Sequence, residues 1–318
     1  MSDLIDKIEQ LKKERKAVIL AHNYQRGEVQ DIADFVGDSL GLSIAASKTK
    51  AKVIVFCGVH FMAETAAIIS PDKTVLMPDV NAGCPMADMI TVDKLKNLLR
   101  TELSLPKPQD EVKLQKPNVP VVCYVNSSAA IKAESDVCCT SANAVNVVKS
   151  LPDREVVFVP DKFLGMFVQG HVPEKQLVLF DGYCPTHAKI LPEHIAKAKA
   201  AHPGASVIVH PECRPETIAA ADAALSTEGM VKYVQESKAK EFLIGTETGI
   251  IHRLQKENPG KKFYPVTELA VCPNMKLTTL EKILWSLEDM KTKVEVPAEI
   301  AGKARRAIER MLAIGRQD

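Results

Sequence analysis

Short apolar runs alternate with segments of helical periodicity along the whole chain. The runs are rich in branched aliphatic residues and end at polar residues, which is typical of buried strands. They lie at residues 17–20, 53–56, 74–77, 119–125, 156–159, 177–180, 206–209 and 242–245. Between them, apolar residues recur three or four positions apart, as in segments 4–15 and 86–100, each of which predicts one helix. Strands that alternate with helices predict right-handed crossovers and small parallel sheets.

This pattern occurs three times, and each occurrence carries three polar markers. The markers are His22, Ser39 and Cys84, then Tyr124, Ser141 and Cys184, then His210, Thr227 and Cys272. In every unit the hydroxyl residue lies 17 positions after the first marker, and the cysteine lies 60 to 62 positions after it. Ligands of parallel sheets bind beyond the carboxyl ends of the strands. We therefore predict an α/β protein of three pseudo-threefold-related αβα domains, each with a small parallel sheet, around a central active site.

The repeats also predict domain boundaries. Repeat 1, with an N-terminal helix, spans residues 1–102, repeat 2 spans 119–200, and repeat 3 spans 201–292. Segment 103–118 contains prolines and alternating charges, so we predict an exposed insertion or linker there. Residues 293–318 predict a C-terminal helix.

Charge and hydropathy narrow the class of protein. The net charge of +1 indicates neither a nucleic-acid groove nor a polybasic membrane contact. No apolar run approaches the ~20 residues that a transmembrane helix requires. The first 16 residues form a charged amphipathic pattern rather than a signal peptide. We predict a cytoplasmic protein whose partners include neither nucleic acid nor membrane.

Three of the eight cysteines precede a proline, and these are the repeated markers Cys84, Cys184 and Cys272. A helix that starts at the proline would place the cysteine at its N-cap, where the helix dipole lowers the pKa of the thiol. Three thiolates from three units suit a [4Fe–4S] cluster with one iron left open to act as a Lewis acid. A zinc site with three cysteine ligands and three unrelated buried cysteines are the alternatives.

The other five cysteines fall outside the repeat, and we predict that they pack in the core. They are Cys57, Cys123, Cys138, Cys139 and Cys213.

The hydroxyl markers lie at predicted helix N-termini, and Ser39 is at the position of an N-cap. They predict anion binding, because free N–H groups and the dipole at helix N-termini attract negative charge. We expect a small ligand that bears carboxylates or phosphate. No Walker-type or GxGxxG loop is present, which disfavours a nucleotide.

Acid–base candidates lie at strand ends or close to a cysteine. Glu212 is close to His210, which could hold it as a general base. Tyr24 is a candidate proton donor or acceptor, and His187 follows Cys184 by three residues. We predict Tyr24, His187, His210 and Glu212 as the catalytic residues.

A set of segments, in order over nearly the whole chain, resembles the quinolinate synthase family of NAD biosynthesis. The segments are AHNYQ, GDS, FCGVHFMAE, AGCPMAD, YVNSSAAIKAESD, CTSAN, GYCPTH, HPEC, STEGM, GTETG and CPNM. The resemblance implies three αβα domains around one [4Fe–4S] cluster, held by Cys84, Cys184 and Cys272. It implies condensation of iminosuccinate with dihydroxyacetone phosphate to quinolinate, phosphate and two waters, with L-aspartate oxidase as a supplier of iminosuccinate.

The resemblance further implies a set of substrate contacts and proton carriers. The substrate contacts are His22, Ser39, Tyr124, Val125, Asn126, Ser141, His210, Pro211, Glu212 and Thr227. Proton transfers are assigned to Tyr24, His187 and Glu212. Some family members carry a redox-active CxxC pair beside the last cluster ligand, but position 269 is leucine here, which predicts that this switch is absent.

Two other functions remain open at this point. An aconitase-type hydro-lyase also uses an open iron, but acts on a single hydroxy acid. An electron carrier or a non-catalytic metal scaffold would not require three helix N-termini near the metal. A radical enzyme is disfavoured because the chain contains no CxxxCxxC motif.

Overall fold

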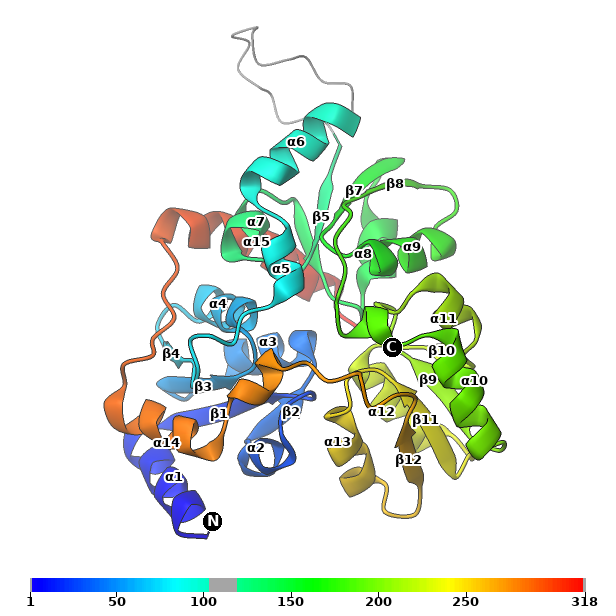
Figure 1. The fold of residues 1–318 in the computed structure, drawn as a ribbon. Coiled ribbons are helices and arrows are strands. Elements are labelled where there is room, and N and C mark those ends of the chain that lie inside the picture. Colours follow the sequence, from blue (N-terminus) through cyan, green and yellow to red (C-terminus); the bar gives the residue numbers. More distant parts are fainter. Residues whose placement is uncertain (1, 103–118, 317–318) are drawn as a thin grey trace, which may run out of the picture.

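The structure is a computed structural model that describes residues 2–102 and 119–316. Within that part of the chain there are three parallel sheets of four strands each, and their strand orders are β2-β1-β3-β4, β6-β5-β7-β8 and β10-β9-β11-β12. Each order places the first strand of the unit between its second and third strands. Figure 1 shows the three sheets as separate blue, green and yellow units. The predicted architecture of three αβα domains is confirmed.

The strands are short and all their pairings are parallel. Their bounds are β1 (Ala17–His22), β2 (Phe35–Gly37), β3 (Val53–Cys57), β4 (Thr74–Leu76), β5 (Val121–Tyr124), β6 (Val137–Cys139), β7 (Glu155–Val159), β8 (Gln176–Leu179), β9 (Ser206–Val209), β10 (Ala223–Ala224), β11 (Glu241–Gly245) and β12 (Lys262–Pro265).

Helices lie between the strands and also before the first strand and after the last. They are α1 (Ser2–Arg15), α2 (Gly27–Ile32), α3 (Ser39–Lys48), α4 (His60–Ile69), α5 (Pro85–Met89), α6 (Val92–Glu102), α7 (Ala129–Ala133), α8 (Ala144–Ser150), α9 (Lys162–His171), α10 (Pro192–Ala201), α11 (Pro215–Ala219), α12 (Thr227–Glu236), α13 (Ile250–Glu257), α14 (Leu280–Asp289) and α15 (Ala298–Ile314). Two 3-10 turns follow cysteine loops, η1 (His187–Lys189) and η2 (Asn274–Leu277).

The position of β3 in the first sheet explains why this strand is apolar throughout. All five residues of β3 are buried. Ile19 and Val55 face a core that includes α1 and α14, whereas Leu20 and Ile54 face a core that includes α3 and α4. Because side chains of a strand alternate between faces and both faces are covered, no position is left for a solvent-facing polar residue.

Two helices pack with a sheet that is distant in sequence. α14 lies beside α1 (Figure 1), and its Leu280, Ile283 and Leu287 join the core of the first sheet. α10 joins the core of the third sheet through Ile195. The boundaries at residues 200 and 292 stay predictions of the sequence, while this packing associates α10 with the third unit and α14 with the first. The predicted insertion at 103–118 lies outside the described residues.

The C-terminal helix α15 packs on α7 and β6 of the second unit and on α4 of the first. Ile308 is fully buried on its inner face, whereas Glu309 is exposed. The helix begins at Ala298 rather than at the predicted 293, because Lys293 pairs with Leu76 as an antiparallel bridge at the end of β4.

We expect Ile308→Ala to lower the free energy of unfolding by about 2–5 kcal/mol, because it leaves a cavity between α15 and the second unit. Urea unfolding followed by circular dichroism measures the effect. Glu309→Ala is the matched control on the same turn and should change stability by less than about 0.5 kcal/mol. Equal stability of the two variants would show that α15 is not part of the core.

Segment 86–100, predicted as one helix, is two helices. Ile90 between them is extended and buried, and the Thr91 hydroxyl accepts a hydrogen bond from the Lys94 amide at 3.2 Å at the start of α6. Burial of the Ile90 side chain and this new cap therefore interrupt the helical pattern.

The hydroxyl markers are not the N-caps. Asp38 caps α3 by accepting from Gly41 N at 2.7 Å, and Ser226 caps α12 by accepting from Gly229 N at 3.1 Å. Ser39 and Thr227 are thus the first residues of their helices. Ser141 lies in a turn three residues before α8.

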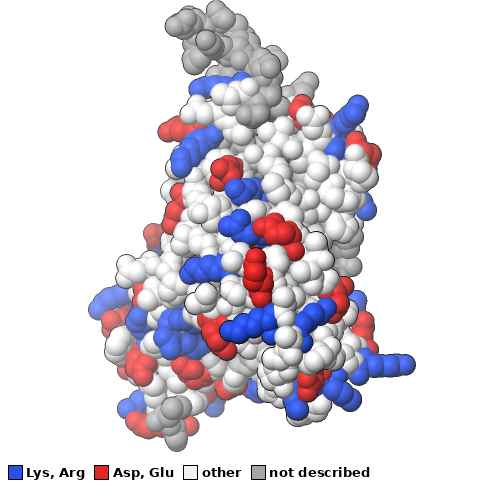
Figure 2. All heavy atoms as spheres, turned by 45° about the vertical axis from the view of Figure 1, so that its right-hand side comes forward, with Lys and Arg blue, Asp and Glu red and all other residues white. Residues whose placement is uncertain are grey.

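The surface carries both signs of charge. Figure 2 shows acidic and basic side chains interspersed over the face that it presents, in keeping with the net charge of +1. Among the described helices, none is both long enough and apolar enough to cross a bilayer.

Candidate functional site

A cavity lined by residues from all three units contains every one of the nine repeated markers. In each unit the first marker ends or follows the first strand, the hydroxyl follows the second strand, and the cysteine follows the fourth. The parallel strands therefore deliver all nine side chains at their carboxyl ends. The cavity is narrow. The volume that the centre of a water molecule can occupy in it is about 70 Å³.

Two neutral histidines supply hydrogen-bond donors to this cavity. Burial lowers the pKa of His22 and of His210 to about 3, so both rings are neutral at physiological pH. Tyr24 N–H donates to Nδ1 of His22 at 3.2 Å, and Glu212 N–H donates to Nδ1 of His210 at 3.3 Å. A neutral ring that accepts at Nδ1 carries its proton on Nε2. Nε2–H of His210 therefore donates to the Ser141 hydroxyl at 3.2 Å.

Glu212 is the acceptor at the centre of the polar network. Its carboxylate accepts from the Tyr124 hydroxyl at 2.5 Å, from Nδ1 of His187 at 2.7 Å and from Nδ2 of Asn126 at 3.4 Å. Burial by itself would raise the pKa of Glu212. Electrostatic interactions with the His187 and His210 rings, which favour the carboxylate over the acid, and the hydrogen bonds from His187 and Tyr124 outweigh burial, and the pKa of Glu212 lies well below its ordinary value. Glu212 is therefore an ionised carboxylate.

A chain of hydrogen bonds extends from Glu212 to Tyr24. An ionised carboxylate can only accept, so His187 carries a proton on Nδ1. Its Nε2 lies 2.8 Å from the Thr246 hydroxyl, which lies 2.5 Å from the Tyr24 hydroxyl. Burial and the nearby Glu212 raise the pKa of Tyr24 well above its ordinary value, so the phenol stays protonated. Tyr24, Thr246, His187 and Glu212 thus connect a proton donor to a proton acceptor.

The three marker cysteines also line the cavity, one from each unit. Each of them is half-buried, and none forms a disulfide. Cys84 is the N-cap of α5, which begins with Pro85 as predicted. Cys184 and Cys272 precede only the short 3-10 turns η1 and η2.

The expectation of lowered thiol pKa values is wrong for this structure. Burial is the main cause that raises the pKa of Cys84 to about 12; the charges of Glu212 and Cys272 act in the same direction, and the amides of Ala87 and Met86 oppose them. Burial likewise raises the pKa of Cys184 and of Cys272. Desolvation therefore exceeds the effect of the helix N-terminus.

The loop that carries Cys272 is held by a buried carboxylate. Glu247 is fully buried, and its Oε1 accepts from the Cys272 amide at 3.2 Å and from Nζ of Lys276 at 2.9 Å. Asn274 of the same loop donates to the carbonyl of Gly83 at 2.8 Å, next to Cys84. The hydrogen bond between Asn274 and Gly83 therefore joins the cysteine loops of the third and first units.

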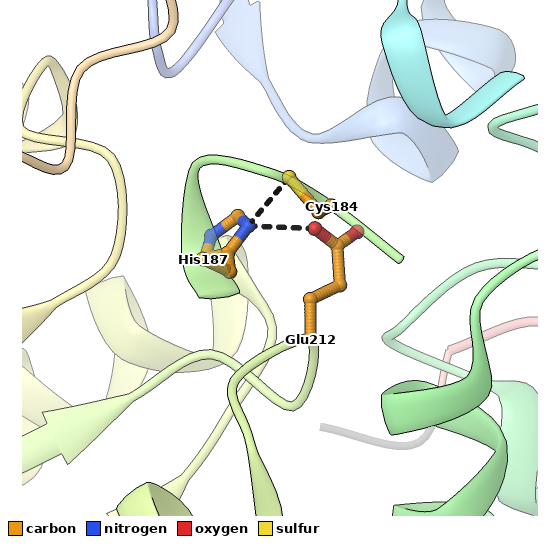
Figure 3. A group of neighbouring side chains, drawn as sticks. All are labelled: Cys184, His187 and Glu212. Atoms are coloured by element: carbon orange, nitrogen blue, oxygen red, sulfur yellow. Dashed lines mark hydrogen bonds and ion pairs between the residues drawn. The ribbon is translucent and has the colours of Figure 1, made fainter. Parts of the chain in front are cut away.

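A second group of side chains could hold a metal ion. Cys184, His187 and Glu212 present ligand atoms that all lie within 4.8 Å of one another, and Figure 3 shows the three side chains converging. Nδ1 of His187 lies 3.1 Å from the sulfur of Cys184 as well as 2.7 Å from Glu212. Only Cys184 belongs both to this group and to the three marker cysteines.

The remaining five cysteines are fully buried, as expected of core residues. The sulfur of Cys213 donates to the carbonyl of Gly245 at 3.6 Å. Leu269, the residue from which the CxxC switch is predicted to be absent, has an exposed side chain in the segment before Cys272.

Most predicted site residues line the cavity, and two do not. Val125 and Pro211 are absent from its wall, although each lies between two residues that line it. Sequence reasoning missed other wall residues, which are Asp38, Val59, Phe61, Met62, Gly83, Met86, Thr140, Thr186, Glu247 and Met275. Sequence reasoning also missed Thr246. Thr246 and Glu247 directly follow β11, and a polar residue at the end of a predicted strand is the signal that could have identified both.

Comparison with known proteins gives one consistent result. The family model described as Quinolinate synthetase A protein matches residues 6–313. A quinolinate synthase of Dehalococcoides mccartyi is 58% identical over 308 residues, which cover 97% of each chain. Quinolinate synthases of Methanosarcina barkeri and Thermodesulfovibrio yellowstonii are 54% and 53% identical, with 98% of each chain covered.

The match extends across all three units, so it includes every strand end that lines the cavity. The relatives also match over 97% to 98% of their own lengths. The family expected from the sequence motifs is confirmed. The chain belongs to the quinolinate synthetase A family.

Proposed function

We propose that this protein is a quinolinate synthase of NAD biosynthesis, which condenses iminosuccinate with dihydroxyacetone phosphate to give quinolinate, phosphate and two waters. The observation that carries the proposal is the convergence of nine markers from three units on one cavity. Three of them are cysteines, and the others are hydrogen-bonding side chains. We further propose that the enzyme is cytoplasmic and that L-aspartate oxidase supplies the iminosuccinate.

The donor set fits a [4Fe–4S] cluster held by Cys84, Cys184 and Cys272. Each unit contributes one half-buried sulfur to the same cavity, and three thiolates leave one iron of such a cluster without a protein ligand. When bound, the cluster would supply Lewis-acid chemistry at that iron. A zinc ion on the same three cysteines, or a metal on Cys184, His187 and Glu212, is the competing arrangement.

The other markers suit a ligand with several anionic oxygens. Nε2–H of His22 is a donor, and the hydroxyls of Ser39, Ser141 and Thr227 line the same wall. Ser39 and Thr227 also lie at the N-terminal ends of α3 and α12, where the helix dipole favours negative charge. Two carboxylates and one phosphate, as in the proposed pair of substrates, match this set of donors.

The hydrogen-bonded chain suits a reaction that loses water and moves protons. Glu212, as an ionised carboxylate, is placed to accept a proton from substrate, and Tyr24, as a protonated phenol, is placed to donate one. Thr246 and His187 connect the two, so a proton that Glu212 has accepted can return to Tyr24 along the hydrogen-bonded chain. His210 contributes through the Ser141 hydroxyl and through its contact with Glu212.

The test is an anaerobic assay of the reconstituted protein with iminosuccinate and dihydroxyacetone phosphate. We expect equimolar quinolinate and phosphate, measured by chromatography and by phosphate release, and neither product when either substrate is omitted. Conversion of a single hydroxy acid without dihydroxyacetone phosphate would instead identify a hydro-lyase. A metal scaffold would form no product, and a dicarboxylate would leave the spectrum of its metal centre unchanged.

A further inference from the structure

A polar network links the surface of the third unit to the cavity through Asn23, a residue to which we assigned no role. Asn23 follows β1 directly and is fully buried. Its Nδ2 donates to the Thr227 hydroxyl at 2.9 Å and to Glu228 at 3.2 Å, and its Oδ1 accepts from Nη1 of Arg253 at 2.8 Å. The network therefore crosses the boundary between the first and third units.

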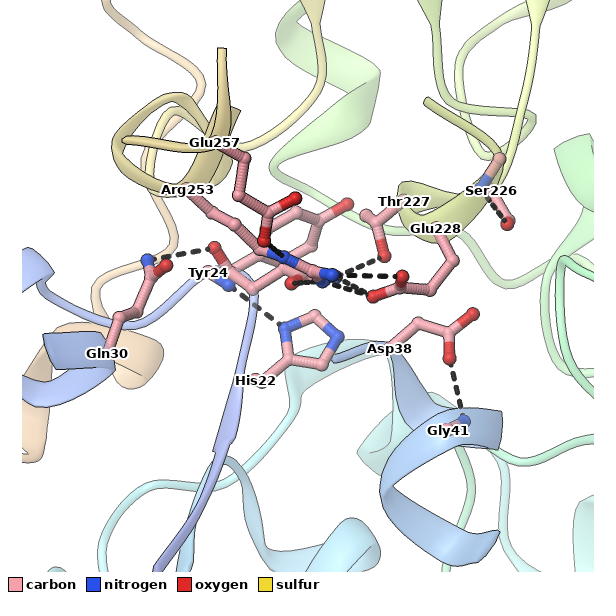
Figure 4. Close-up of polar contacts among 12 residues, drawn as sticks. His22, Tyr24, Gln30, Asp38, Gly41, Ser226, Thr227, Glu228, Arg253 and Glu257 are labelled. Carbon is pink, nitrogen blue, oxygen red and sulfur yellow. Dashed lines mark hydrogen bonds and ion pairs between the residues drawn. The ribbon is translucent and has the colours of Figure 1, made fainter. Parts of the chain in front are cut away.

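The partners of Asn23 allow only one orientation of its amide. The guanidinium of Arg253 can only donate, and the carboxylate of Glu228 can only accept. Oδ1 must therefore face Arg253, and Nδ2 must face Glu228 and Thr227. Arg253 is itself held, because it forms an ion pair with Glu228 and donates from Nε to Glu257 at 2.7 Å. Figure 4 shows Arg253 between Glu257 and Glu228, with Thr227 next to Glu228.

This orientation determines the direction of the Thr227 hydroxyl hydrogen. Because Asn23 donates to Oγ1, that oxygen is an acceptor in the contact and its own hydrogen must point elsewhere. Within residues 2–102 and 119–316, no acceptor forms a hydrogen bond with it. Thr227 is almost fully buried and lines the cavity, so the cavity is the direction left for this hydrogen.

The same arrangement occurs at another boundary between units. His210 of the third unit donates from Nε2 to the Ser141 hydroxyl of the second, which leaves the Ser141 hydrogen free in the same way. Two hydroxyls of the cavity are thus turned into donors by a neighbouring unit. A carboxylate or phosphate oxygen is the chemical class that such donors recognise.

We propose that Asn23 and Arg253 are positioning residues for anion recognition, which act by directing the Thr227 hydroxyl hydrogen toward an anionic oxygen of the ligand. The inference rests on the proposed function, because that function supplies the anionic ligands. Neither residue touches the ligand; Asn23 acts through Thr227, and Arg253 acts through Asn23.

A double-mutant cycle on the anaerobic holoenzyme tests this. Calorimetric Kd values for quinolinate and for dihydroxyacetone phosphate are measured on Asn23→Ala, Thr227→Val and the double variant. For at least one ligand we expect each single variant to bind about 10- to 100-fold more weakly, as for loss of a hydrogen bond to a charged group. The double variant should then bind no more than about twofold more weakly than Thr227→Val. Whichever ligand responds shows whether a carboxylate or the phosphate is recognised.

Controls separate this role from a general effect on folding. Thr227→Ser keeps the hydroxyl and should bind within about threefold of wild type, and Glu257→Gln, on the far side of the guanidinium, should bind as wild type does. If Asn23→Ala does not fold, Arg253→Gln replaces it in the cycle, since Arg253 is partly exposed. Additive losses in the double variant, or unchanged Kd values for both ligands, would overturn the inference. Failure of wild type to form quinolinate would instead overturn the proposed function.

Discussion

Replacement of Cys84, Cys184 or Cys272 by serine is expected to abolish the metal centre, with iron falling from about four atoms per chain to none. Each cysteine comes from a different unit and each lines the same cavity. A cluster that relies on three protein sulfurs has no spare ligand, because one of its irons is already open. Anaerobic iron and acid-labile sulfide analysis, together with the visible spectrum, measures the loss.

Cys213→Ser is the matched control for these variants. Cys213 is fully buried, and a serine hydroxyl at this position could still donate to the Gly245 carbonyl. We expect this variant to keep its full iron content. Equal loss of iron in all four variants would reject the choice of ligands, and zinc without sulfide in the wild type would replace the cluster with a three-cysteine zinc site.

Glu212→Gln is expected to keep the cluster but to lower kcat by about 10²- to 10⁴-fold, the range typical of a lost acid–base group. A neutral amide cannot take up a proton as the carboxylate can. It must also turn its NH₂ group toward either Tyr124 or His187, both of which donate to Glu212 at present. The change therefore removes the acceptor end of the chain that leads to Tyr24.

Steady-state quinolinate formation and iron content, measured on the same preparation, separate the two effects. Glu216→Gln, an exposed glutamate on α11, is the control and should retain both. Full activity of Glu212→Gln would remove Glu212 from the mechanism. Loss of iron in Glu212→Gln but not in Cys84→Ser would point instead to a metal held by Cys184, His187 and Glu212.

The positions of the helix caps show where local sequence signals stop being decisive. Asp38 and Ser39 are both residue types that cap helices, and so are Ser226 and Thr227. The pattern placed each helix start correctly to within one residue, but the structure assigns the cap to Asp38 and Ser226. That shift of one residue leaves the hydroxyls of Ser39 and Thr227 free to line the cavity.

The pKa of the cysteines shows a second limit. A proline after Cys84 correctly predicts a helix start, and a helix start by itself lowers the pKa of a thiol. The extent of burial depends on what other units place around the sulfur, and burial is the larger effect here. No local pattern around Cys84 carries that information.

The triplicated pattern of strands and markers predicts three small parallel sheets and the side chains at their carboxyl ends. The spacing of the repeats is visible in the sequence, and parallel strands always present their carboxyl ends at the same edge of a sheet. Which of those side chains share protons was decided only by the packing of the units. Tyr24 meets Thr246 across 222 residues, and Asn23 meets Arg253 across 230. Contacts between units depend on how their surfaces fit together, and this is a property of the tertiary structure that no spacing along the chain encodes.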